Sequence, residues 1–192
     1  MNKKICNKCI MDCSASDIIF YGNKGCNYCL ELSTNFEKTG INNAKLQKEK
    51  LDQLLESIKK KGRNKRFDCI VGVSGGVESS WVLIKAIESG LRPLAVHMDN
   101  GWNSELAQNN IANLVNTLGV ELYTHVIDWP EYKGLMQGFF DADVLDVELL
   151  MDNAMLAVNY SQASKNNIKY ILAGTNMNSE GMEMPSNMNW FK

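Results

Sequence analysis

The stretch VGVSGGVESSW, residues 71–81, places small and hydroxyl-bearing residues between an apolar run and a helical pattern. Its glycines allow positive φ angles and close approach of the backbone, and its serines donate hydrogen bonds. At the start of a helix, free backbone N–H groups and the helix dipole attract an anion. The stretch therefore predicts a phosphate-binding loop, and the alternative is an ordinary tight turn between a strand and a helix. The residues of the predicted loop are Ser74, Gly75, Gly76, Val77, Glu78, Ser79 and Ser80.

Two known phosphate-binding patterns are missing from this loop, and their absence limits the kinds of nucleotide site it could form. It has no lysine in the place that the pattern G-x-x-x-x-G-K-[ST] requires, so it is not a Walker A loop. It also lacks the pattern G-x-G-x-x-G, which disfavours dinucleotide binding of the Rossmann kind.

Four of the six cysteines form two C-x-x-C pairs whose spacing is typical of a zinc site. The pairs occupy residues 6–9 and 26–29, and the strand-like DIIFY at 17–21 with a glycine turn at 22–25 predicts a hairpin between them. A closed site of four thiolates is usually structural, because it leaves no position for a substrate. The alternatives are free or disulfide-bonded cysteines and an iron–sulfur cluster. The predicted ligands are Cys6, Cys9, Cys26 and Cys29.

An alternation of apolar runs and helical patterns after residue 66 predicts the fold that positions these residues. The predicted strands are 67–73, 91–99, 121–128 and 168–174, and the predicted helices are 77–89, 104–118, 131–140 and 148–166. Strands that lack polar alternation and are each followed by a helix indicate a parallel sheet covered on both faces. We therefore predict a doubly wound α/β fold with a small N-terminal zinc-knuckle segment. Ligands bind such sheets outside the carboxyl ends of the strands, which selects residues 74–80, 99–103, 128–129 and 174–180.

The chain divides into three predicted segments: a zinc-binding segment 1–33, a linker and helix 34–66, and the α/β domain 67–192. In the second segment, apolar residues at 51, 54, 55 and 58 form one helical stripe. The basic run that follows, KKKGRNKR at 59–66, is interpreted as cations at a helix C-terminus that ends at Gly62. A tRNA-binding patch is the alternative interpretation of this run.

Three further side chains lie where a ligand could reach them. Trp102 and Trp129 follow two of the predicted strands, where aromatic residues are expected to cap the core, with a stacking surface as the alternative. Asp152 belongs to the last predicted helix, and we expect it to be a solvated helix carboxylate that does not face the cleft.

Composition limits the classes of function. The 192 residues are 45% hydrophobic and carry a formal net charge of −2, which suits one globular domain with a small appendage. The isoelectric point of about 5.7 gives the chain no general attraction to nucleic acid. No apolar run follows the N-terminal lysines or approaches the roughly 18 residues of a membrane helix. We therefore expect a cytoplasmic protein without membrane contact.

The loop SGGVESS resembles the SGGxDS pyrophosphate loop of the PP-loop ATP pyrophosphatases, whose α/β fold is HUP-like. Within that superfamily, CNKCIMD, CNYC, the phrase LRPLAVHMDNGWNSELAQNNI and the run YTHVIDW together resemble the N-acetyl sugar amidotransferases. The resemblance covers nearly the whole chain. It implies an enzyme that converts an acetamido group on a nucleotide-linked sugar to an acetamidino group, in bacterial surface polysaccharide, lipopolysaccharide or nonulosonic acid biosynthesis.

The resemblance also implies a mechanism. The amide oxygen of the sugar attacks the α-phosphorus of ATP, pyrophosphate leaves into the loop, and ammonia displaces AMP from the adenylylated intermediate. Catalytic roles are implied for Ser74, Glu78 and Asp99, and ATP binding is implied for the loop residues together with His97, Gly174 and Thr175. The implied cofactors are Mg²⁺ and Zn²⁺. The implied partners are a glutaminase and a synthase-like subunit, which supply the ammonia.

Two features depart from the family pattern. Glu78 stands where the loop pattern has aspartate, which keeps the charge but moves the carboxylate by about 1.5 Å, one C–C bond. Family members also continue well beyond residue 192, so we expect the α/β domain to be incomplete. The alternatives are a catalytically incomplete nucleotide-binding subunit and a PP-loop tRNA thiolation enzyme. The second would need a basic face and a sulfur-carrying cysteine in the cleft, and the acidic isoelectric point argues against it.

Overall fold

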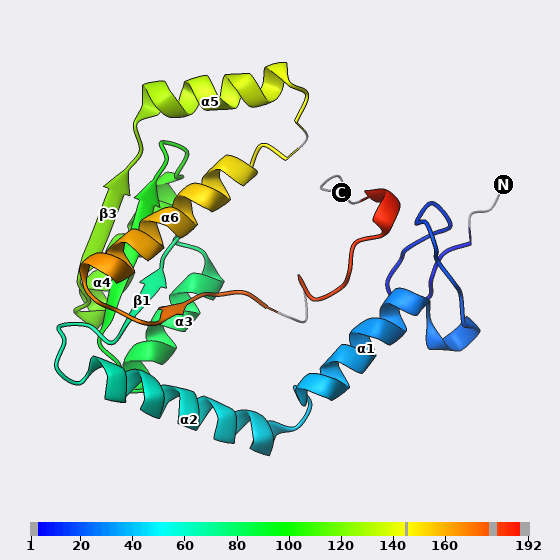
Figure 1. Ribbon diagram of the computed structural model, residues 1–192, viewed down its shortest axis with the longest axis horizontal. Helices are drawn as coiled ribbons and strands as arrows, with labels where there is room; N and C mark the ends of the chain where they lie inside the picture. The colour runs from blue at the N-terminus through cyan, green and yellow to red at the C-terminus, as the bar shows by residue number, and fades with distance from the viewer. Residues whose placement is uncertain (1–3, 145, 177–179, 189–192) are drawn as a thin grey trace. The chain divides into compact units, whose positions relative to one another are not determined.

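Figure 1 shows the computed structural model, which describes residues 4–144, 146–176 and 180–188. The chain forms two compact units, Asp52–Gly174 and the combination of Met1–Leu51 with Thr175–Lys192. The predicted division after residues 33 and 66 remains a prediction, and part of its last segment, residues 177–179 and 189–192, lies outside the described residues.

A parallel sheet forms the centre of the unit Asp52–Gly174. Its described strands are β1 (Cys69–Gly72), β2 (Pro93–Asp99), β3 (Leu122–Val126) and β4 (Ile171–Leu172), in the order β3-β2-β1-β4. Val71 of β1 pairs with Ala95 on one side and with Leu172 on the other, so the central strand aligns its two neighbours. All the pairings are parallel, which brings the carboxyl ends of the strands to one edge.

Helices follow the strands as predicted: α3 (Val77–Glu88), α4 (Glu105–Leu118), α5 (Trp129–Asp141) and α6 (Leu149–Lys165). The hydroxyl of Ser104 caps α4 by accepting a hydrogen bond from the N–H of Ala107, and Asp128 caps α5 by accepting one from Glu131. Gly119 ends α4 in a left-handed conformation with φ of 64°, which a glycine adopts without steric cost.

Both faces of the sheet are covered, which confirms the doubly wound α/β fold. Cys69 and Val71 pack into one apolar cluster with residues of α2 (Ala44–Gly62), α3 and α4. Ile70 between them packs into a second cluster with residues from the end of α6 and after it. Figure 1 shows α6 running across its face of the sheet. Strand residues that are apolar on both sides explain why the sequence lacked polar alternation there.

Asp68 and Arg92 form an ion pair at the amino ends of β1 and β2. The carboxylate of Asp68 is 4% exposed, and Arg92 contacts it with two guanidinium nitrogens, at 2.7 and 3.1 Å. The backbone N–H of Arg92 also donates to this carboxylate, over 2.8 Å. Burial alone would raise the pKa of Asp68, but these hydrogen bonds outweigh burial and lower it.

The basic run at 59–66 makes contacts within its own unit. Arg66 pairs with Glu121, Lys65 donates to the carbonyl of Asn167, and Lys61 lies over the ring of Tyr170. These cations lie at the amino-end side of the sheet and have intramolecular partners. The observation supports the interpretation of the run as a helix terminus, and it gives no support to a tRNA-binding patch.

The other unit contains the cysteine pairs, and its described helices are η1 (Gly22–Lys24), α1 (Asn27–Thr39), the beginning of α2 (Ala44–Gly62) and η2 (Ser186–Met188). The predicted strand at 17–21 is wrong: this region has single bridges, Phe20 with Cys26 and Ile5 with Asp12. A positive φ of 59° at Asp17 breaks the extended conformation that a strand needs. No helix was predicted at Asn27–Thr39, where α1 forms.

Residues near the end of the described chain are hydrogen-bonded to the loop between the two cysteine pairs. Oδ1 of Asn187 accepts from the N–H of Ser16 over 2.7 Å, and Nδ2 of Asn187 donates to the carbonyl of Ser14 over 2.8 Å. The hydroxyls of Ser16 and Ser186 lie 2.8 Å apart. This unit is therefore assembled from both ends of the sequence.

The predicted apolar stripe of α2 is only partly buried. Ile58 is fully buried against the sheet, but Leu51 and Leu54 are exposed. Among the helices in the described ranges, none combines the length and the apolar character that crossing a bilayer requires.

Candidate functional site

The predicted phosphate loop connects β1 to α3, and its serines are hydrogen-bonded to one another. The N–H of Ser74 donates to Oγ of Ser79 over 3.2 Å, and the hydroxyl oxygens of these two residues are also 3.2 Å apart. The hydroxyls of Ser79 and Ser80 both donate to the carbonyl of Gly76, over 3.2 and 2.7 Å. The loop is therefore held in one shape by its own hydroxyl groups.

Gly75 sits against the first turn of α4. Its φ is +79°, a conformation that side chains disfavour, and a Cβ atom at this position would lie 2.5 Å from the carbonyl oxygen of Ala107. The carbonyl of Gly75 accepts a hydrogen bond from Nδ2 of Asn110, over 3.1 Å. Only glycine meets both demands, so the loop and α4 hold each other in place.

The N-terminus of α3 differs from those of α4 and α5. Its N-cap residue is Gly76, and within the described residues no side chain caps it. The first N–H groups of α3 thus remain available to an anion at the positive end of the helix dipole. Glu78 lies in this first turn with an exposed side chain. The arrangement can bind a phosphate oxygen and hold a carboxylate beside it.

Gly174 brings the end of β4 to the same place. A Cβ atom at Gly174 would lie 3.0 Å from the backbone nitrogen of Ser79 and 3.2 Å from Cβ of Glu78. The absence of a side chain therefore allows the backbone after β4 to approach the first turn of α3. The structure brings Gly174, Glu78 and Ser79 together, as the prediction of a shared ligand site requires.

His97 connects the phosphate loop to the loop that follows β2. Its ring is buried, Nδ1 lies 2.9 Å from the carbonyl of Val73, and Nε2 lies 3.2 Å from Nδ2 of Asn103. Because a carbonyl and an amide NH₂ face the two ring nitrogens, the neutral tautomer with the proton on Nδ1 satisfies both contacts. Nδ2 of Asn103 also donates to Oδ1 of Asp99, over 3.1 Å. His97 is therefore a positioning residue that orders both loops.

A cavity of about 550 Å³ opens at the carboxyl ends of β1, β2 and β4, beside α6. Its walls are mainly apolar, and its polar lining residues are Ser74, His97, Asn100, Asn103, Asp152 and Asn159. Of the residues predicted to bind ATP, Ser74, His97 and Gly174 line it. An apolar cavity with a few polar groups and a phosphate loop at its rim has the form of a nucleotide site.

Other predicted residues stand outside the cavity wall. Asp99 does not line the cavity, but it accepts a hydrogen bond from Asn103, which does. Val77 has a side chain that is 82% exposed, so only its backbone belongs to the predicted anion site. Thr175 belongs to the other unit, so its role stays a prediction.

Of the polar residues that line the cavity, Asn100 and Asn103 lie in the predicted ligand-binding range 99–103, Asp152 was expected not to face the cleft, and Asn159 was not predicted. Asn100 and Asn103 follow β2, and Asp152 and Asn159 lie seven residues apart on α6, where Asp152 lines the cavity and is not merely a solvated carboxylate. Because residues seven positions apart lie on one face of a helix, the sequence could have predicted that Asp152 and Asn159 face the same way. Oδ1 of Asn159 is buried and has no hydrogen-bond partner within the part of the chain that the structure describes.

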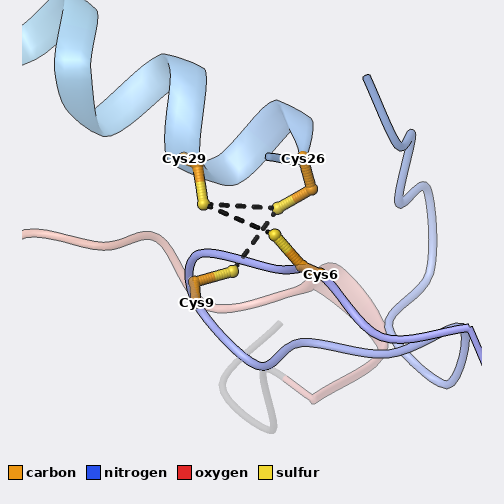
Figure 2. Close-up of side chains that lie close together, drawn as sticks. All are labelled: Cys6, Cys9, Cys26 and Cys29. Carbon is orange, nitrogen blue, oxygen red and sulfur yellow. Dashed lines mark hydrogen bonds between the residues drawn. The ribbon is translucent and has the colours of Figure 1, made fainter. Parts of the chain in front are cut away.

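The four predicted metal ligands converge in the other unit. Cys6 and Cys9 come from the N-terminal loop, and Cys26 and Cys29 come from the start of α1, with all four side chains pointing toward one another (Figure 2). Their sulfur atoms lie within 4.8 Å of one another. Cys13 is exposed and does not belong to this cluster.

The sulfur separations fit a single tetrahedral ion. Cys6 and Cys29 are 3.8 Å apart, Cys26 and Cys29 are 3.8 Å apart, and Cys9 and Cys26 are 3.5 Å apart. A zinc ion with Zn–S bonds of about 2.3 Å requires tetrahedral edges of about 3.8 Å. A disulfide would need about 2.05 Å, and a multi-iron cluster would separate thiolates that bind different irons. The donor set therefore fits zinc best.

The thiols of this cluster differ in their pKa values. The backbone N–H of Lys8, 3.4 Å from the sulfur of Cys6, lowers the pKa of that thiol to about 6. Burial raises the pKa of Cys9 to about 12 and also raises that of Cys29. A divalent cation at the centre would stabilise all four thiolates at once, and metal binding would therefore stabilise the fold of this segment.

The sequence model of the NAD synthase family matches residues 46–183, and no curated protein matches the chain. The NH3-dependent NAD synthetase from Campylobacter jejuni is similar in structure, with 14% identity, a TM-score of 0.50, and coverage of 66% of this chain and 55% of that chain. The glutamine-dependent NAD+ synthetase from Acinetobacter baumannii, solved with adenosine diphosphate, gives 18% identity, a TM-score of 0.54, and coverage of 67% and 26%.

The protein thus spans about half, or less, of the length of these solved structures. At such identities the structural likeness establishes the fold alone. The NAD synthetases belong to the PP-loop ATP pyrophosphatase superfamily, which confirms that part of the sequence prediction. Because the family match extends over well more than half of its residues, the chain belongs to the NAD synthase family.

Proposed function

We propose that this chain is an ATP-dependent, ammonia-using amidotransferase that activates an acceptor oxygen as an adenylate. One observation carries the proposal: the uncapped start of α3 and its loop stand at the rim of an apolar cavity, and Ser74 belongs to both. A nucleotide with its base in the cavity would place its phosphates at this helix start. Family membership supports the same chemistry.

The roles of the residues follow from this placement. The backbone N–H groups of the loop and the hydroxyl of Ser74 would bind the departing pyrophosphate, and Gly174 would let the backbone approach the α-phosphate. Glu78 has the charge and the position to hold Mg²⁺, which when bound neutralises phosphate charge. Asp99 would face the acceptor side of the cavity. Most of the rate enhancement would come from positioning and charge stabilisation.

For the acceptor, we propose an acetamido group on a nucleotide-linked sugar, which would become an acetamidino group with release of AMP and pyrophosphate. The support is the sequence resemblance of the cysteine pairs and the AVHMDNGWNSE phrase to the N-acetyl sugar amidotransferases. A pathway of surface polysaccharide or nonulosonic acid synthesis belongs to the same proposal. Ammonia would come from a glutaminase and a synthase-like partner. The buried ring of His97 is occupied by contacts to Val73 and Asn103, which leaves it unavailable for glutaminase chemistry.

For the cysteine cluster, we propose a structural zinc ion held by Cys6, Cys9, Cys26 and Cys29. The support is the fit of the sulfur separations to a tetrahedron. Four thiolates would complete the coordination, so the ion would stabilise this segment and take no part in the chemistry at the cavity.

Titration calorimetry of Mg²⁺-ATP tests the nucleotide site. We expect the wild type to bind and the Ser74→Ala variant to lose most of its affinity, while a Ser89→Ala control at the end of α3 binds as the wild type does. If the wild type does not bind Mg²⁺-ATP, the proposed function is wrong and the family match reflects common ancestry alone. Binding without turnover would instead support a catalytically incomplete nucleotide-binding subunit.

An assay of pyrophosphate release tests the acceptor. We expect release that requires both ammonia and an acetamido sugar nucleotide. If a nicotinate dinucleotide supports release and NAD forms, the sugar assignment is wrong and the adenylylation proposal stands. A tRNA substrate that supports release would favour the thiolation alternative, which the contacts of the basic run at 59–66 do not support.

A further inference from the structure

Two exposed tryptophans stand together at the carboxyl edge of the sheet. Trp102 is 64% exposed and Trp129 is 43% exposed, and their ring centroids are 5.7 Å apart in an edge-to-face arrangement. Trp129 in turn lies against the buried ring of Tyr132, at 5.9 Å. Trp129 therefore packs on one core residue, but neither tryptophan is buried as a cap of the core would be. Large exposed aromatic faces cost free energy in water, so their presence beside a cavity indicates a binding surface.

Backbone contacts order the loop that carries Trp102. The N–H of Gly101 donates to Oδ1 of Asp99 over 3.0 Å, and the N–H of Trp102 donates to Oδ1 of Asn100 over 2.9 Å. Gly101 has a φ of +78°, which side chains disfavour, and it lies beside the Trp129 ring, since a Cβ there would be in ordinary contact with the ring at 3.6 Å. Trp129 is the first residue of α5, which Asp128 caps. A ligand that stacked on these rings would therefore lose little affinity to ordering of the protein.

The pair does not line the cavity, but its loop contains residues that do. Asn100 and Asn103, on either side of Trp102 in the sequence, both line the cavity wall. The N–H of Ile127 donates to the carbonyl of Asp99 over 3.0 Å, which joins the loop after β2 to the segment that leads to Trp129. A molecule on the tryptophans can thus extend a group toward the nucleotide site.

The charged side chains near Trp102 and Trp129 indicate which kind of ligand this surface could bind. Oδ1 of Asp99 and Oδ1 of Asp128 accept backbone hydrogen bonds, and in the described ranges no hydrogen bond reaches the second oxygen of either carboxylate. Glu131 adds a third negative charge on the first turn of α5. Proteins that stack nucleic-acid bases supply a positive groove, whereas these carboxylates would repel a phosphate group that lay on the rings. The carboxylates accept hydrogen bonds from hydroxyl groups, and the C–H face of a pyranose ring matches an indole face.

We propose that Trp102 and Trp129, with Asp99 and Asp128, form the subsite that binds the pyranose ring of the acceptor sugar. This inference rests on the proposed function, because it concerns the acceptor of the same reaction. The tryptophans stack on the apolar face of the ring, and the two carboxylates accept hydrogen bonds from its hydroxyls. The ring is thereby held at the cavity mouth, from which its acetamido group reaches the nucleotide site.

The test compares UDP-N-acetylglucosamine with UDP by titration calorimetry, so that the ratio of their affinities isolates the sugar ring. We expect the wild type to prefer the sugar nucleotide, and Trp102→Ala and Trp129→Ala to lower that ratio by about tenfold, which corresponds to about 1.4 kcal/mol. Trp102→Phe keeps a flat ring and retains most of the preference. The matched control is Trp81→Ala, since Trp81 is also exposed but lies on α3.

Titration of Mg²⁺-ATP into the same variants separates the two proposals. Unchanged ATP affinity with a lost sugar preference supports the subsite. A sugar preference that survives both alanine variants overturns the subsite and leaves the proposed function in place. A wild type that binds ATP but shows no preference for the sugar nucleotide overturns the subsite together with the sugar assignment, and a wild type that binds neither overturns the proposed function itself.

Discussion

The phosphate loop packs against α4 at Gly75, where a Cβ atom would lie 2.5 Å from the carbonyl oxygen of Ala107. This contact joins the anion-binding loop to the helix that follows β2. A shift of one therefore displaces the other.

Replacing Gly75 with alanine should destabilise the protein and weaken nucleotide binding. The positive φ alone costs about 1–2 kcal/mol for a residue with a side chain, and the collision with Ala107 adds to it. Urea unfolding and titration of Mg²⁺-ATP measure the two effects. The control is Gly134→Ala in α5, where a new Cβ meets no atom within 4 Å among the described residues and should stabilise the helix by about 0.5–1 kcal/mol. Equal stability of the two variants would contradict the role of the contact.

The carboxylate of Glu78 should make ATP binding depend on Mg²⁺. In Glu78→Gln the side chain keeps its size but loses its charge, so we expect affinity for Mg²⁺-ATP to fall about tenfold, or about 1.4 kcal/mol. Glu78→Asp restores the residue of the PP-loop pattern and should bind at least as well as the wild type. The measurement is calorimetry with Mg²⁺ and with excess chelator. If the glutamine variant shows the same loss in chelator, Glu78 does not act through the metal.

The ion pair of Asp68 and Arg92 should contribute far more to stability than the pair of Arg66 and Glu121. Arg92→Met leaves a buried carboxylate without its partner, which we expect to cost about 3 kcal/mol. Arg66→Met breaks a pair whose side chains are 74% and 47% exposed, so its cost should stay below about 1 kcal/mol. Urea unfolding at pH 7 measures both. Similar costs for the two variants would contradict this account.

The contribution of Asp68 should also depend on pH. Its pKa in the folded protein is lowered, since the bonds to Arg92 outweigh burial. The folded state therefore binds this proton less readily than the unfolded state, whose aspartates titrate near pH 3.9. The contribution is complete above that pH and is lost as the pH falls through the lowered folded value. The difference between the wild type and Arg92→Met should accordingly shrink as the pH falls, first as the unpaired Asp68 of the variant is protonated and then as the pH passes the lowered pKa of the wild type, and a constant difference from pH 7 to pH 3 would rule this linkage out.

Zinc should be bound with a stoichiometry of one ion per chain by the four clustered cysteines. Cys26→Ser removes a buried ligand and should abolish zinc retention, as measured by elemental analysis, and make residues 4–51 sensitive to protease. Cys13→Ser, a change outside the cluster, should leave both properties unchanged. Substitution with Co²⁺ should give the absorption bands of a tetrahedral thiolate site. Full zinc retention by Cys26→Ser would contradict the four-cysteine assignment.

The sequence predicted the strands and helices of the α/β unit closely, because their signals are local. The helix predicted at 104–118 is α4 at 105–118, with Ser104 as its cap and Gly119 as its end. β4 is the exception: the run 168–174 was predicted as a strand, but only Ile171 and Leu172 pair with β1. Pairing depends on a neighbouring strand, which the periodicity of one segment does not contain.

Residues that act through distant contacts were harder to predict. The SGG loop could be found from its composition, but the contact of Gly75 with Ala107 joins two elements that are separated in sequence. The exposure of Trp102 and Trp129 depends on how two loops meet, and it contradicts the expectation that aromatic residues after strands cap the core. The four cysteines were predictable from spacing alone, whereas the strand expected between them was not compatible with the turn at Asp17.

The hydrogen bonds from Asn187 to Ser14 and Ser16 constrain the order of events during synthesis. A ribosome releases the N-terminal residues first, so the cysteines up to Cys29 can meet a metal ion while most of the protein is still unmade. The loop between the cysteine pairs can form these hydrogen bonds only after Asn187 has been synthesised. Asn187 lies 171 positions after Ser16 and 173 positions after Ser14. The smaller unit can thus begin to fold before β1–β4 are translated, but it gains these contacts only after them.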